Sequence, residues 1–170
     1  MIEALPHKVK KLRAEFVNPK YTVVECAASD RDGIVDFEMN EIDETSSLLK
    51  IRRELPELSA IKMGKATTLS VQARTLDGIA GEAGICEIDL LKIDVQGAEL
   101  KVLAGAPMTL PRTRFVWMEV SFKPLYENSA TFFEMYEQMQ RHGFGLLDMT
   151  CAFRAPNKEM LQANGLFFRK

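Results

Sequence analysis

The sequence predicts an α/β fold in which helices pack on both faces of a largely parallel sheet. Segments with a strand pattern alternate with segments of helical periodicity along most of the chain, and this alternation is typical of such a fold. Residues 88–95 form a largely apolar run with Asp94 near its end, which is typical of a buried strand. Gly97 permits a tight turn, and a helical pattern follows. In open α/β sheets, ligands bind where such strands end.

The first half of the chain contains one predicted helix and three predicted strands. Val9, Leu12 and Phe16 recur at helical spacing after Pro6 and predict a helix over 6–17. The strands are expected over 21–28, 34–39 and 67–74. Residues 40–66 are polar and weakly patterned, so they predict no regular element.

The second half alternates more regularly between the two patterns. Helices are expected over 76–83, from 98 to about 104, and over 131–141. Gly105 and Gly143 follow the last two helices in the position of a C-cap. Strands are expected over 88–95, 115–120, 144–149 and 166–169.

Composition limits the classes of protein that the chain can represent. With 170 residues, 46% of them apolar, the chain can bury the core of one domain, which we place over 1–170. A net charge of −2 gives no basic face for nucleic acid. No run approaches the ~20 apolar residues of a membrane span, so we expect no membrane association. The three cysteines form no CxxC pair, which favours a reducing, cytoplasmic location.

Two stretches of the chain resemble the FkbM family of S-adenosylmethionine-dependent methyltransferases. They are LLKIDVQGAELKVLAGA, of which Leu91 to Ala106 is the most specific part, and FVWMEVSFKPLYE. Weaker supporting patterns are AASDRDGIVDF, TSSLL, RTLDGI, GFGLLDM and GLFFRK. The resemblance implies the Rossmann-like sheet of class I methyltransferases, with strand order 3-2-1-4-5-7-6 and strand 7 antiparallel. In that scheme Asp94 ends strand 4 and Glu119 ends strand 5.

One part of the family pattern has no counterpart in the sequence. The first strand and its glycine-rich loop, which wraps the methionine part of the cofactor, would lie before residue 1. Gly78, Gly81 and Gly84 follow a helix and precede a strand, the reverse of the context that a binding loop needs, so we interpret them as linker glycines. We expect an N-terminally truncated domain with two unpaired sheet edges, which could re-pair or be covered by a homo-oligomer. We expect the isolated chain to bind the cofactor weakly or not at all.

Two carboxylates are the candidate catalytic residues. Asp94 and Glu119 would end neighbouring strands about 5 Å apart and face one crevice. Like charges this close raise one pKa, or recruit a divalent cation such as Mg²⁺. The alternative, given equal weight, is that one of them caps the next helix or pairs with Lys92 or Lys123.

The resemblance also implies binding residues. Glu3, at the tail of strand 2, would bond the ribose hydroxyls of the cofactor, and Asp30 would contact the adenine unless it is an ordinary turn residue. Lys123 and Tyr126 follow Glu119 and would line the pocket of the acceptor. Glu99 matches the motif, but its place in the first turn of a helix suffices to explain it.

The resemblance implies S-adenosyl-L-methionine as the cofactor and transfer of a methyl group to a hydroxyl. The acceptor would be a small molecule or glycan, such as a sugar or a secondary metabolite. The alternative is a non-catalytic remnant or interaction module that no longer binds the cofactor. A nucleotide hydrolase or a dehydrogenase is not indicated, because neither GxxxxGK[ST] nor GxGxxG after a strand occurs.

Overall fold

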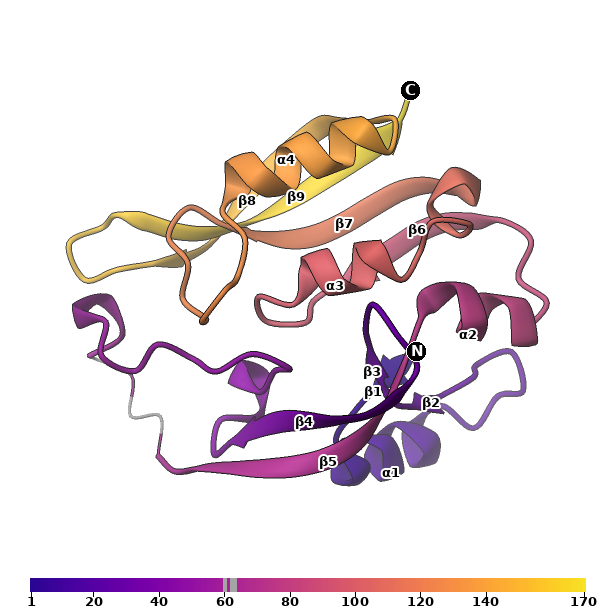
Figure 1. The fold of residues 1–170 in the computed structure, drawn as a ribbon, viewed down its shortest axis with the longest axis horizontal. Coiled ribbons are helices and arrows are strands. Elements are labelled where there is room, and N and C mark those ends of the chain that lie inside the picture. The colour runs from indigo at the N-terminus through magenta and orange to yellow at the C-terminus, as the bar shows by residue number, and fades with distance from the viewer. Residues whose placement is uncertain (60, 62–63) are drawn as a thin grey trace.

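The computed structural model describes residues 1–59, 61 and 64–170 and has a mixed α/β architecture (Figure 1). The helices are α1 (Pro6–Glu15), α2 (Leu76–Glu82), α3 (Glu99–Ala104) and α4 (Phe132–Arg141). The strands are β1 (Ile2–Glu3), β2 (Val24–Glu25), β3 (Ala27–Ala28), β4 (Gly33–Asn40), β5 (Ala66–Arg74), β6 (Ile88–Ile93), β7 (Thr113–Ser121), β8 (Phe144–Arg154) and β9 (Met160–Arg169). Within the described residues, no helix is long and apolar enough to cross a bilayer.

The second half of the chain forms a four-stranded sheet with the order β6-β7-β9-β8. β6 and β7 are parallel, and β9 is antiparallel to both of its neighbours. This is the order expected for strands 4-5-7-6. The last two strands extend further than predicted, because β8 and β9 form a long hairpin with irregular register near Asp148 and Phe153.

The prediction of one largely parallel sheet is wrong for the described residues. Three separate sheets are present, the others having the orders β1-β2 and β3-β5-β4. β4 and β5 pair antiparallel over eight residue pairs, from Gly33↔Ala73 to Asn40↔Ala66. Periodicity identifies a strand but not the direction of its partner, so this ladder could not be predicted from the pattern. The predicted strand over 21–28 is divided into β2 and β3 at Cys26.

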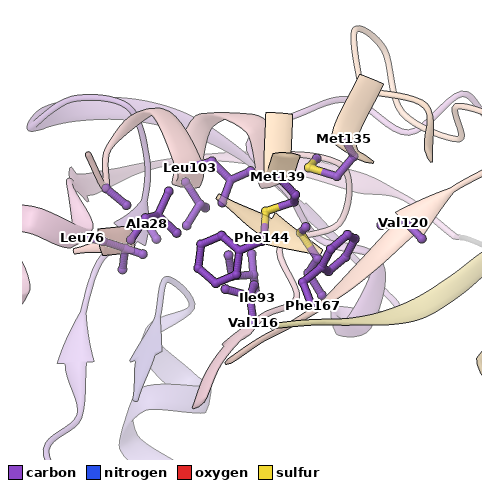
Figure 2. Close-up of a cluster of buried hydrophobic side chains, with 14 of the residues drawn as sticks. Ala28, Leu76, Ile93, Leu103, Val116, Val120, Met135, Met139, Phe144 and Phe167 are labelled. Atoms are coloured by element: carbon purple, nitrogen blue, oxygen red, sulfur yellow. The ribbon is translucent and has the colours of Figure 1, made fainter. Parts of the chain in front are cut away.

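Helices α3 and α4 cover the same face of the four-stranded sheet, whereas helices were expected on both faces of the whole sheet. Val116, Met118 and Val120 alternate along β7 and therefore point to one face. They share a core cluster with side chains from both helices (Figure 2), such as Leu103 of α3 and Met139 of α4. The alternate residues of β7, which include Glu119, point to the opposite face. Polar residues on that face can therefore form a site without replacing apolar side chains of the main core.

Candidate active site

The register of β6 and β7 brings Asp94 and Glu119 close to each other. Ile93 pairs with Met118 in the last pair of the parallel ladder, so Asp94 and Glu119 are the residues that follow it, although β7 continues to Ser121. Since Ile93 and Met118 are buried in the core under α3 and α4, their neighbours point to the sheet face opposite these two helices. The two carboxylates are electrostatically coupled, because Asp94 contributes to the raised pKa of Glu119.

Glu119 is a largely buried carboxylate with one hydrogen-bond donor. The Gln162 side-chain amide on β9 donates to Glu119 Oε2 and also approaches Ser121 Oγ at 3.4 Å. Burial raises the pKa of Glu119 to about 7, and the charges of Asp94 and then Glu99 add to the effect. A carboxyl group with this pKa can accept or donate a proton near neutral pH.

Asp94 is half-exposed, and both of its carboxylate oxygens have partners. Lys92 Nζ lies 3.1 Å from Oδ2, and Gln96 Nε2 donates to Oδ1 at 2.9 Å. The ion pair of Asp94 with Lys92, which the sequence offered as the alternative to a catalytic role, is thus present as well. Lys123 instead pairs with Glu57, away from Asp94.

The turn after β6 brings a third carboxylate to the site. Gln96 and Gly97 both have positive φ, at 54° and 92°. A Cβ on Gly97 would lie 3.0 Å from the Tyr126 side chain, so the turn requires glycine here. Glu99 Oε1 accepts a hydrogen bond from Gly97 N at 3.1 Å, and burial raises the pKa of Glu99 to about 7. Sequence reasoning assigned Glu99 to the helix dipole, because the motif does not reveal that this side chain is buried.

A large cleft lies between the first strands and β6. Its volume is about 950 Å³, and its lining includes both Glu3, at the end of β1, and Asp94. Glu3 Oε1 accepts from Leu5 N at 2.8 Å. The apolar part of the lining includes Ile2, Val24, Leu90 and Leu91. Two of the three predicted cofactor-binding residues therefore line one cavity.

Asp30 lines a second cavity, of about 350 Å³, whose lining shares Leu48 with the cleft. The Ser29 hydroxyl, 2.9 Å away, is the largest cause of the lowered pKa of Asp30. Lys101 Nζ lies 4.0 Å from its carboxylate. Asp30 is therefore held as an anion near the cleft.

The two residues predicted for the acceptor pocket line neither cavity. Tyr126 is only 2% exposed, and its hydroxyl lies 2.9 Å from Gln96 Oε1 and 3.1 Å from Thr45 O. Lys123 is held by Glu57. Among the residues that the structure describes, no group of three or more His, Cys, Asp or Glu side chains could hold a metal, so the expected divalent cation at Asp94 and Glu119 is not supported.

Comparison with known proteins decides the family. The family model described as "Methyltransferase FkbM domain" matches residues 1–146. The chain belongs to the FkbM methyltransferase family. The resemblance seen in the sequence is thereby confirmed, and the motif around Asp94 lies within the matched FkbM region.

Two curated relatives of this FkbM domain share the matched region. The chain is 39% identical over 110 residues to 2-O-methyltransferase NoeI of Sinorhizobium fredii, covering 61% of this chain and 44% of the relative. It is 32% identical over 119 residues to AMB antimetabolite synthetase AmbE of Pseudomonas aeruginosa, covering 69% of this chain and 6% of the relative. The chain thus spans less than half the length of both. No solved structure matches it significantly.

Proposed function

We propose that the chain acts as an S-adenosylmethionine-dependent methyltransferase that methylates a hydroxyl group of a sugar or secondary metabolite. The observation that carries this proposal is the coupled pair Asp94 and Glu119: Asp94 lines the cleft, and its neighbour Glu119, which lines neither cavity, has a pKa of about 7. The FkbM family supports methyl transfer, and the name of the relative NoeI supports oxygen as the methylated atom.

The residues around the cleft fit the cofactor. A volume of about 950 Å³ is at the upper end of ligand pockets, and its lining joins apolar side chains to Glu3 and Asp94. Carboxylates accept hydrogen bonds from ribose hydroxyls and from an ammonium group, and they favour a nearby sulfonium charge. In our proposal Glu3 holds the ribose, Asp30 lies toward the adenine and Asp94 lies near the methionine part. The bound cofactor supplies an electrophilic methyl group.

The proposed role of Glu119 is that of a general base. An alcohol is a weak nucleophile, so removal of its proton as the new bond to carbon forms assists the transfer. Glu119 is ionised in about half of the molecules at a pH equal to its pKa, about 7. The Gln162 amide orients its carboxylate. Lys92 and Gln96 hold Asp94 at the cleft, where its charge keeps the pKa of Glu119 high.

We also propose that the three sheets are parts of one Rossmann-like architecture. In the described part of the chain, β1 and β6 each have one unpaired edge, and the cleft lies between them. A further parallel strand in this position, from additional chain or from a second copy, would join the sheets and cover the edges. The free thiols of Cys26, Cys86 and Cys151 support a reducing compartment such as the cytoplasm.

Transfer of a labelled methyl group tests the proposed function. The protein is incubated with S-adenosylmethionine carrying a tritiated methyl group and a panel of monosaccharides, oligosaccharides and small alcohols. We expect label to appear in at least one hydroxyl compound and the Glu119→Gln variant to lose this activity. Asp148→Asn, an exposed acid on β8, is the matched control. Label in an amine or thiol but in no hydroxyl compound would contradict O-methylation.

A further inference from the structure

The Gln96 side chain bridges two residues of the site. Its Nε2 donates to Asp94 Oδ1 at 2.9 Å, and its Oε1 lies 2.9 Å from the Tyr126 hydroxyl. Tyr126 comes from the loop after β7, so the bridge joins segments 30 residues apart.

The polarity of this bridge is determined by its two ends. A carboxylate paired with Lys92 offers only acceptors, so the amide must present its NH₂ group to Asp94 and its carbonyl oxygen to Tyr126. A reversed amide would place Oε1 against the carboxylate oxygen. Gln96 Oε1 can only accept, so its contact with the Tyr126 hydroxyl uses the hydroxyl proton, which Thr45 O also approaches at 3.1 Å.

The backbone of Gln96 is fixed as firmly as its side chain. Its φ of 54° is uncommon for a residue other than glycine, and such conformations persist where the surroundings enforce them. Ser47, from the loop after β4, donates to Gln96 O at 2.8 Å. Tyr126 is almost fully buried, so it cannot move without disturbing the core around it. The Gln96 backbone and the Tyr126 side chain, which carry the two ends of the bridge, are thus both held in place by their surroundings.

We propose that Gln96 and Tyr126 are positioning residues for Asp94. Tyr126 fixes the amide of Gln96, and Gln96 holds the Asp94 carboxylate at the edge of the cleft beside Glu119. Tyr126 acts through Gln96 and does not contact the acceptor. The effect on methyl transfer rests on the proposed function, whereas the effect on Asp94 rests on the hydrogen bonds alone.

The position of Asp94 can be tested without turnover. Protein labelled with ¹³C at the aspartate carboxyl carbons gives an Asp94 resonance, which is assigned by its loss in Asp94→Asn. We expect Tyr126→Phe to move this resonance. The matched control is Tyr136→Phe, which removes a tyrosine hydroxyl bonded to Gln140 on α4 and is expected to leave the resonance in place. An Asp94 resonance that is unchanged in Tyr126→Phe would overturn the proposal.

Turnover gives a second, independent test. We expect Tyr126→Phe to lower kcat roughly three- to tenfold, the loss of about one hydrogen bond. Combined with Gln96→Ala, it should cause no further loss, because both changes act on one bridge. Losses that multiply would contradict action through Gln96. If the wild-type protein transfers no methyl group, the proposed function is wrong. The Asp94 carboxyl resonance still tests whether Tyr126 and Gln96 position Asp94.

Discussion

Glu119 follows Met118 and Asp94 follows Ile93, the last pair of the parallel ladder of β6 and β7, and the Asp94 charge adds to burial in raising the pKa of Glu119 to about 7. The two carboxylates differ in environment, since Asp94 is half-exposed and paired with Lys92, whereas Glu119 is mostly buried. Unequal environments allow one acid to remain charged while its neighbour exchanges a proton. Asp94 is therefore suited to be the fixed charge of the pair, and Glu119 the group that carries the proton.

Glu119→Gln should abolish most of the methyl transfer. Removal of a general base costs about 10²- to 10⁴-fold in rate, and glutamine keeps the size of the side chain. We expect a loss in this range, measured as kcat/KM with a labelled methyl group. The exposed Glu87→Gln substitution serves as the control. A loss of less than about tenfold would exclude Glu119 as the base.

Asp94→Asn should shift the pH dependence of the reaction. Since a base must be deprotonated to act, the wild-type kcat should rise with pH through the Glu119 pKa of about 7. The asparagine side chain carries no charge, so in this variant the pKa of Glu119 should fall and the rise in kcat should move to lower pH. A pH profile whose acidic limb stays in place would show that the two carboxylates are not coupled.

Glu99→Gln should change the dependence of stability on pH. The folded-state pKa of Glu99 is raised to about 7 from 4.5, so the folded protein binds more protons than the unfolded chain between these values. Glu99 alone should therefore lower the free energy of unfolding by roughly 3 kcal/mol as the pH rises from about 4.5 to 7. In Glu99→Gln this contribution should disappear, as measured by urea unfolding at several pH values. The same slope in both proteins would refute the buried, protonated Glu99.

Gly97→Ala should destabilise the turn at the site. The φ of Gly97 is 92°, and a Cβ would meet Tyr126 and Ser129 at 3.0 Å. We expect a loss of about 1–3 kcal/mol in the free energy of unfolding. Gly81→Ala is the opposite case, since this glycine of α2 has open space around its Cβ position, and alanine should add about 0.5–1 kcal/mol. Equal effects of the two substitutions would contradict this account of the turn.

Local pattern predicted the elements of the second half of the chain well. The apolar run before Asp94, Gly97 and the helix that follows are all encoded within a few residues, and so is the capping box of Thr131 and Glu134 on α4. The candidate pair Asp94 and Glu119 could be predicted because parallel neighbours end at one edge of a sheet.

Features that depend on distant partners were missed. The antiparallel ladder of β4 and β5 joins segments about 30 residues apart, and the chain between them has no strong pattern. The burial of Glu99 and the bridge through Gln96 depend on contacts with segments elsewhere in the chain, such as Tyr126 with Gln96. Whether a helix covers one face of the sheet or the other is likewise decided by the packing of the whole domain.

Binding of S-adenosylhomocysteine is the most direct test of the cleft as the cofactor site. The sequence predicts weak binding or none, and the cleft lined by Glu3 and Asp94 favours weak binding. Isothermal titration of the 170-residue chain should therefore show saturable one-to-one binding with a dissociation constant on the order of 0.1–1 mM. Glu3→Ala and Asp94→Ala should each weaken it, while Asp148→Asn should not. Saturable binding that neither Glu3→Ala nor Asp94→Ala changes, or no binding at any concentration, would contradict the account.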